Sequence, residues 1–158
     1  FIFNITGKNV QIKWPNDILV NEQKIAGVLI ENQLRNSKIH SSIIGIGLNV
    51  NQINFTNNLS ASSLRVLTHR EYDLSSLLEI FLNVFNSNLS ILKKQKFNSI
   101  DAQYLKYLFN YNKWSSYKEK DVVFKAKLNS VNKQGLLELD LENGTSKLYD
   151  FQQISQLI

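Results

Sequence analysis

The sequence predicts an α+β fold, in which a mixed, largely antiparallel sheet backed by helices is followed by a small β-barrel. Three observations support this prediction. Apolar and polar residues alternate in several short runs before residue 51, apolar residues recur at helical spacing between residues 74 and 92, and short alternating runs return after residue 114. We therefore expect one domain over residues 1–112 and a second over residues 113–158.

The first 50 residues predict a short helix followed by strands. Residues 1–5 are mostly apolar, and Gly7 beyond them is typical of a helix C-terminus. Pro15 interrupts the next alternating run, because proline has no N–H for a sheet and favours an extended residue before it. Short polar links separate the later runs, which is typical of antiparallel pairing. The expected strands comprise residues 10–14, 18–20, 24–33 and 39–50.

Two helices are expected after a polar loop over residues 51–58. Asp73 is well placed as the N-cap of the first helix, because its carboxylate can accept bonds from N–H groups of the first turn. A shorter helix is expected over residues 99–109, and the apolar stripes of both helices are interpreted as core packing. The stripe of the first helix consists of Leu74, Leu77, Leu78, Phe81, Phe85, Leu89 and Leu92.

The alternation after residue 114 indicates the short strands of a small all-β barrel. Asn143-Gly144 is a strong signal for a short hairpin, and residues 132–135 provide a second polar link. The expected strands comprise residues 124–129, 137–142, 147–151 and 154–157.

The composition excludes several kinds of chemistry. The chain has no cysteine, which excludes disulfides, thiolate nucleophiles and zinc held by cysteine. With only two histidines, a metal site built from histidine is not expected. The net charge of +5 comes from lysines scattered along the chain, so we expect no nucleic-acid partner. No apolar run approaches the roughly 20 residues that span a bilayer, and we expect a cytoplasmic protein without a membrane partner.

The first candidate motif is Lys13-Trp14-Pro15-Asn16-Asp17, at the end of an expected strand. The lysine offers a positive charge and three donors to phosphate oxygens, while the asparagine and the aspartate suit hydroxyl groups or Mg²⁺. From the residues alone, an ordinary strand-to-turn transition is the favoured interpretation, because Pro-Asn-Asp is also good turn sequence.

The second motif is Lys24-Ile25-Ala26-Gly27, at the start of the next long strand. Alternation places Lys24 on the face of Ala26, whose small side chain leaves the lysine room to reach a ligand. Gly27 suggests the close approach of another backbone. The alternative is an ordinary surface lysine on a hairpin.

The third motif is Gly45-Ile46-Gly47-Leu48-Asn49. Gly45, Gly47 and Asn49 share one face of the expected strand, so the other face is apolar and this one is almost bare. Each glycine costs a strand about 0.5–1 kcal/mol relative to alanine, and a ligand lying flat on the sheet would explain that cost. A bulge or tight helix packing is the competing explanation. A dinucleotide-binding loop is rejected, because the strand–turn–helix setting is lacking.

The three motifs lie on successive strands of one expected sheet, and their order and spacing resemble those of the biotin–protein ligases. The Lys-Trp-Pro-Asn-Asp string at residues 13–17 is the most specific part of the resemblance. Residues 132–135 resemble a hairpin of the family's C-terminal domain. The resemblance implies the C-terminal part of a ligase domain like the class II aminoacyl-tRNA synthetases, followed by an SH3-like barrel.

The resemblance also implies an ATP-dependent enzyme that acts in two steps. Biotin attacks the α-phosphate of ATP, which enters with Mg²⁺, and gives biotinyl-5′-AMP and pyrophosphate. A lysine of the biotin carboxyl carrier domain of acetyl-CoA carboxylase, or of a related carboxylase, then takes the biotin. Lys24 matches a family lysine that contacts biotin and the phosphate linkage, and Lys13 matches one near the reacting groups, so both are expected to be catalytic. The matches on the nucleotide side are Asn16, Asp17 (also placed to contact Mg²⁺), Gly45, Gly47 and Asn49.

The sequence departs from the family in one respect. The family's Arg- and Gly-rich loop, which closes over biotin and the adenylate, is not found, nor is the optional N-terminal DNA-binding domain. We expect the C-terminal two thirds of a ligase, inactive alone and without a repressor role. Two alternatives remain open. One is a relative that handles lipoate or another acid, because the acyl pocket lies in the part not found; the other is a non-catalytic module that binds a partner or nucleic acid.

Overall fold

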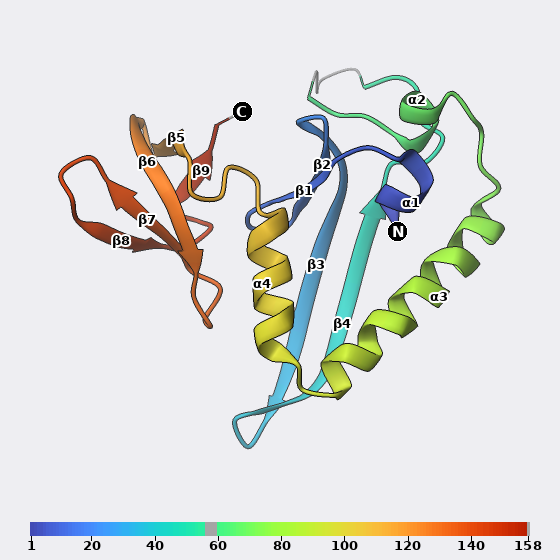
Figure 1. Ribbon diagram of the computed structural model, residues 1–158, viewed down its shortest axis with the longest axis horizontal. Helices are drawn as coiled ribbons and strands as arrows, with labels where there is room; N and C mark the ends of the chain where they lie inside the picture. The colour runs from blue at the N-terminus through green and yellow to red at the C-terminus, as the bar shows by residue number, and fades with distance from the viewer. Residues whose placement is uncertain (56–59, 158) are drawn as a thin grey trace. The chain divides into compact units, whose positions relative to one another are not determined.

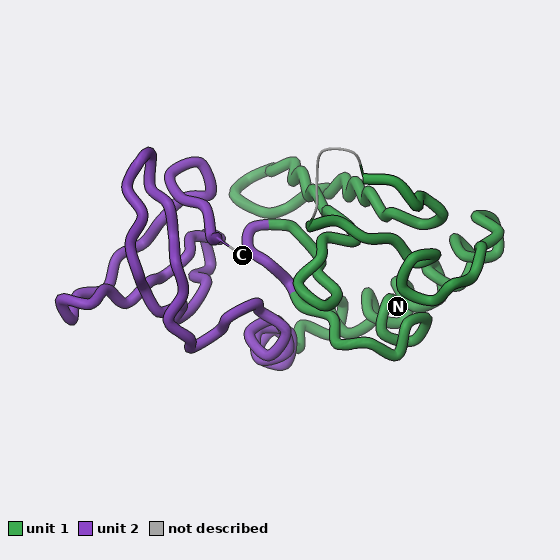
Figure 2. Tube along the Cα trace, turned by 90° about the horizontal axis from the view of Figure 1, so that it is seen from above, with its two compact units in different colours: residues 1–11, 16–96 green, residues 12–15, 97–158 purple. Residues whose placement is uncertain are grey.

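The computed structural model describes residues 1–55 and 60–157, and it contains two compact units (Figure 1). The first unit consists of Phe1–Gln11 and Asn16–Lys96, and the second consists of Ile12–Pro15 and Phe97–Ile158 (Figure 2). Each unit combines helices with antiparallel strands, which confirms the α+β class. The boundary expected after residue 112 stays a prediction, because compact packing does not show which part folds alone.

A four-stranded sheet in the order β1-β2-β3-β4 forms most of the β structure of the first unit (Figure 1). Its strands are β1 (Val10–Lys13), β2 (Asp17–Val20), β3 (Gln23–Arg35) and β4 (Lys38–Leu48). β3 pairs antiparallel with both β2 and β4, and the long β3–β4 hairpin turns at Asn36 and Ser37, which both have positive φ. The spatial order follows the chain order, so the predicted meander is confirmed.

Three helices accompany this sheet: α1 (Ile2–Thr6), α2 (Leu64–Thr68) and α3 (Leu74–Lys93). α1 ends at Gly7 with a φ of 62°, as predicted. The carboxylate of Asp73 accepts a hydrogen bond from the Ser76 amide at 2.8 Å, which confirms it as the N-cap of α3. The sequence did not predict α2, whose N-cap Ser63 accepts a bond from the Val66 amide at 3.1 Å.

The polar loop expected over residues 51–58 falls between β4 and α2. Residues 51–55 of the expected loop form neither helix nor strand, and residues 56–58 lie outside the described residues.

Within the described part of the chain, no helix has the length and the apolar character needed to cross a bilayer.

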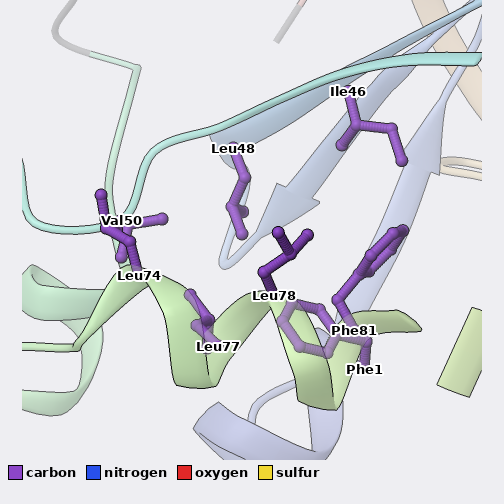
Figure 3. Close-up of a pocket in the computed structure, with 8 residues that line it drawn as sticks. All are labelled: Phe1, Ile46, Leu48, Val50, Leu74, Leu77, Leu78 and Phe81. Carbon is purple, nitrogen blue, oxygen red and sulfur yellow. The ribbon is translucent and has the colours of Figure 1, made fainter. Parts of the chain in front are cut away.

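The N-terminal half of the apolar stripe of α3 faces one side of β4. Leu77 is buried, while Leu78 and Phe81 line a small apolar pocket together with Ile46 and Leu48 (Figure 3). Core packing is therefore confirmed at Leu77, and it is wrong for Leu74, Leu78 and Leu92, which are 61%, 55% and 48% exposed. The buried core of the first unit consists of Val20, Ile25, Ala26, Leu64 and Leu77.

The second unit contains α4 (Phe97–Tyr107) and a five-stranded sheet in the order β8-β7-β6-β5-β9. Neighbouring strands all pair antiparallel. The side chain of Asn132 accepts bonds from the amides of Gln134 and Leu136, and Gly144 has a φ of 81°, so both predicted turns are confirmed. The strands are β5 (Trp114–Glu119), β6 (Val122–Val131), β7 (Leu137–Leu141), β8 (Ser146–Tyr149) and β9 (Ile154–Gln156). The sequence did not predict β5, because its residues show no clear alternation.

Trp14 belongs to the core of the second unit. Its side chain is only 6% exposed, and its indole N–H donates to the Gly135 carbonyl at 3.0 Å. Next to it, the Ile12 carbonyl accepts a bond from the Phe109 amide at 2.7 Å. β1 ends at Lys13, one residue before the expected end, and the tryptophan of the first motif is a packing residue. The other buried members of this core are Leu108, Tyr117, Ala126, Leu128, Leu137, Leu139, Tyr149 and Ile154.

The two tryptophans of the chain offer a matched test of this packing. Trp14→Ala should lower the free energy of unfolding by about 3–5 kcal/mol, because it leaves a cavity in a packed core. Trp114→Ala, at a side chain that is 53% exposed, should change it by less than about 1 kcal/mol. Urea unfolding followed by circular dichroism measures both. Equal losses in the two variants would contradict the assignment of Trp14 to the core.

Burial raises the pKa of the Tyr117 hydroxyl from 10.0 to about 12. The unfolded chain therefore loses this proton near pH 10 while the folded protein retains it, so the tyrosine's contribution to stability falls as the pH rises from 10 to 12. The urea midpoint of Tyr117→Phe should fall less between pH 10 and pH 12 than the urea midpoint of the wild type. A residual decrease is expected, because burial also raises the pKa of Tyr104. An unchanged pH dependence in the variant would refute the prediction.

Candidate functional site

The strands that carry the three motifs place their glycines on one face of the first sheet. Gly27 of β3 pairs with Asp17 of β2 on one side and with Gly47 of β4 on the other. Gly45 lies two residues before Gly47, so it shares the same face. The next row of paired residues across the sheet is Ile18, Ala26 and Leu48. It faces the other side and belongs to the core that also contains Leu77 of α3. We call the face of Gly27, Gly45 and Gly47 the glycine face.

Neither packing nor backbone geometry requires the glycines of β4. A Cβ atom on Gly47 would meet no heavy atom of the described residues within 4 Å beyond its chain neighbours. At Gly45 it would touch Leu29 at 3.9 and 4.0 Å, which is ordinary van der Waals contact. Neither glycine has a positive φ, and the register shift between β3 and β4 lies at Gln33 and Leu34. Tight helix packing and a bulge are therefore wrong as explanations, and the glycines keep a surface clear.

An ion pair borders the glycine face. The Lys24 ammonium nitrogen lies 2.5 Å from a carboxylate oxygen of Asp17, with side chains that are 43% and 23% exposed. A Cβ on Gly27 would lie 3.8 Å from that oxygen and 3.8 Å from the ammonium nitrogen. Gly27 thus forms the floor beneath the pair. The expectation that Gly27 marks the close approach of another backbone is wrong, because its nearest neighbours are side-chain atoms.

Lys24 reaches this face because β3 contains a bulge. Ile18 pairs with Ala26, whereas the next residue, Leu19, pairs with Lys24, so Ile25 is an extra residue without a partner in β2. The extra residue reverses the alternation along the strand. The predicted position of Lys24 on the face of Ala26 is therefore wrong, since its ammonium lies over the glycine face.

The bulge also opens the backbone of Lys24 to a second segment of the chain. The Lys24 N–H donates to the Ser60 carbonyl at 2.7 Å, and the Lys24 carbonyl accepts a bond from the Ser62 amide at 2.9 Å. Asn49 supports this segment, because its side-chain nitrogen donates to the Ser62 carbonyl at 3.0 Å. No local sequence pattern signals that bond, because its partners are 13 residues apart. The expected contact of Asn49 with a nucleotide stays a prediction.

Two further predicted residues have different surroundings. Lys13 ends β1 and belongs to the second unit, whereas Asp17 and Lys24 belong to the first. The convergence of Lys13 and Lys24 on one phosphate stays a prediction. Asn16 is exposed, and its backbone carbonyl accepts a bond from the Val28 amide at 2.9 Å, which ties the start of β2 to β3. Among residues 1–55 and 60–157, no cluster of three His, Cys, Asp or Glu side chains could hold a metal ion.

Comparisons with known sequences identify proteins that are similar to this chain. Residues 3–49, which carry all three motifs, match the Biotin/lipoate A/B protein ligase family. The chain is 30% identical over 147 residues to the bifunctional ligase/repressor BirA of Bacillus subtilis (strain 168), covering 90% of this chain and 45% of that protein. It is 35% identical over 101 residues to biotin–protein ligase 2 of Arabidopsis thaliana, covering 61% of this chain and 29% of that protein. The chain therefore spans less than half the length of these relatives.

Solved structures agree with the sequence matches. The apo structure of the biotin protein ligase from Aquifex aeolicus matches with a TM-score of 0.75 and 25% identity, over 99% of this chain and 68% of that chain. Its complex with biotin and ATP matches with a TM-score of 0.74 and 25% identity, over 99% of this chain and 65% of that chain. These findings confirm the resemblance to the biotin–protein ligase family that the three motifs predicted.

The clear surface at Gly47 leads to a prediction about stability. Gly47→Ala should raise the free energy of unfolding by about 0.5–1 kcal/mol, because alanine loses less backbone freedom in a strand. Its Cβ has room, since no heavy atom of the described residues beyond the chain neighbours lies within 4 Å. Urea unfolding measures the change. A marked loss of stability would mean that the fold itself requires glycine at this position.

Proposed function

We propose that the whole protein is an ATP-dependent, AMP-forming biotin–protein ligase. The observation that carries the proposal is the clear glycine face with a lysine ammonium at its border. A flat anionic ligand such as an acyl-adenylate fits a surface that glycines leave open beside a cation. The family match supports this ligand, as does the likeness to a biotin protein ligase solved with biotin and ATP. Because the chain spans only part of its relatives, the activity is proposed for the full-length protein.

In the first step, a carboxylate oxygen of biotin attacks the α-phosphorus of ATP. A carboxyl–phosphate bond forms, the bond from the α-phosphorus to the oxygen that bridges to the β-phosphate breaks, and pyrophosphate leaves with the Mg²⁺ that entered with ATP. Negative charge develops on the phosphoryl oxygens, and a positioned ammonium stabilises it. Lys24 has this role in the proposal, and Lys13 supplies a second positive charge near the reacting groups.

The other residues of the site shape the nucleotide side. The two glycines of β4 let the adenylate lie against the strand without a steric clash. The amide groups of Asn16 and Asn49 provide donors and acceptors for the nucleotide. The residues proposed for the nucleotide side are Asn16, Gly45, Gly47 and Asn49, and Asp17 lies beside them as the partner of Lys24.

In the second step, the amine of a carrier lysine attacks the biotinyl carbonyl carbon. An amide bond forms, the bond from that carbon to the phosphate oxygen breaks, AMP leaves and the amine proton passes to solvent. The carrier in this proposal is the biotin carboxyl carrier domain of acetyl-CoA carboxylase or a related carboxylase, in the cytoplasm.

The proposal also covers the domain boundary and the fold of each domain. Residues 1–112 would be the C-terminal part of a ligase domain like the class II aminoacyl-tRNA synthetases, and residues 113–158 an SH3-like barrel. The five short antiparallel strands of the second unit support a small barrel, and so does the match to the Aquifex aeolicus structure.

Biotin-dependent exchange of pyrophosphate into ATP by the full-length protein tests the first step. Lys24→Ala should slow exchange by about 10²–10³-fold, because one fixed donor to the transition state is lost. Gly47→Val should also block exchange, while its folded structure remains, because the branched side chain fills the surface on which the adenylate rests. Lys38→Ala is the matched control at an exposed lysine of β4 and should retain full activity.

Two outcomes would overturn the proposal. Exchange that depends on lipoate and not on biotin would assign the site to the other branch of the family. No exchange with either acid, together with salt-sensitive binding to DNA of arbitrary sequence, would indicate a non-catalytic binding module.

A further inference from the structure

We propose that Asp17 is a positioning residue, which holds the Lys24 ammonium over the edge of the glycine face. This inference rests on the proposed function, because it assigns a role within the site where the adenylate forms. Asp17 acts through Lys24 in this assignment, in place of the Mg²⁺ contact that the family resemblance implied.

Backbone hydrogen bonding anchors both partners of the pair. Asp17 begins β2 and pairs with Gly27 of β3. Lys24 is bonded through its N–H to Ser60 and through its carbonyl to Ser62. The contact of 2.5 Å therefore joins side chains that start from two well-defined backbone positions. A carboxylate at that distance favours one conformation of the long, flexible lysine side chain.

The position of the pair suits contact with a ligand on the glycine face. Gly27 lies beneath both charged groups and pairs with Gly47 of the neighbouring strand. Because glycine has no side chain, neither residue separates the Lys24 ammonium from the glycine face. A lysine ammonium has three N–H donors, and a carboxylate oxygen of Asp17 engages it from one side. Donors therefore remain for the oxygens of an acyl-adenylate.

The chemistry of the pair favours positioning over metal binding. The Asp17 carboxylate already binds a cation of the protein, the Lys24 ammonium. A carboxylate that faced the phosphates directly would repel them, whereas one that binds Lys24 directs a positive charge at them.

The stability of the fold does not account for the pair. Both side chains are partly exposed, and ion pairs of that kind contribute little to folding. The pair between Arg65 and Glu71, at 3.6 Å and with the carboxylate side chain 68% exposed, provides a matched control in the same unit. Loss of either carboxylate should leave the urea midpoint almost unchanged, so an effect of Asp17 on turnover would come from the site.

A double-mutant cycle in the full-length protein tests the inference, with biotin-dependent exchange of pyrophosphate into ATP as the readout. Asp17→Asn should lower kcat by about 10–100-fold with little change in the KM for ATP, because a misplaced cation loses transition-state contact. The variant that combines Asp17→Asn with Lys24→Ala should be no slower than Lys24→Ala alone. Asp17→Glu should restore part of the rate, and the control Glu71→Gln should match the wild type.

Effects that multiply in the double variant, or a higher Mg²⁺ requirement in Asp17→Asn, would overturn the inference, because Asp17 would then act directly on metal or nucleotide. A second readout does not depend on turnover: acylation of lysine amines followed by mass spectrometry. Lys24 should be labelled about twofold to fivefold faster in Asp17→Asn, with Lys38 unchanged. Wild-type protein without exchange activity would refute the proposed function, while the labelling rate still decides whether Asp17 holds Lys24.

Discussion

The bulge at Ile25 is the feature on which the candidate site depends, because it decides which way Lys24 points. It turns two consecutive side chains, Ile25 and Ala26, into the same core and sends the preceding lysine to the opposite face. The backbone groups that the bulge displaces find other partners: Lys24 bonds to the segment of residues 60–62, and the Ile25 carbonyl accepts a bond from the Asn49 amide at 2.9 Å. The position of the lysine is thus set by backbone hydrogen bonding.

The two faces of β4 serve different purposes. Ile46 and Leu48 line the apolar pocket beneath α3, and this apolar contact favours the observed register of the strand. Gly45 and Gly47 alternate with them and add no side chain to the other face. A slip of one residue would exchange the two sets and cover the glycine face with apolar side chains. Packing on one face therefore protects the clear surface on the other.

The string of residues 13–17 serves both compact units. Trp14 fills the core of the second unit and donates to the Gly135 carbonyl, whereas Asp17 begins a strand of the first unit and binds Lys24. A short motif can therefore combine packing residues with site residues. Its specificity as a family signal does not mean that each of its side chains meets the ligand.

Local pattern was sufficient for most of the secondary structure, because alternation, helical spacing, caps and turn residues depend on neighbours along the chain. The meander, the cap at Asp73 and the bare face at Gly45 and Gly47 could all be predicted in this way. The tertiary structure alone decided the face of Lys24, its pairing with Asp17 and the burial of Trp14 in a core formed mostly by residues more than a hundred positions away. Those features depend on strand register and on contacts distant in sequence, which periodicity within one segment does not encode.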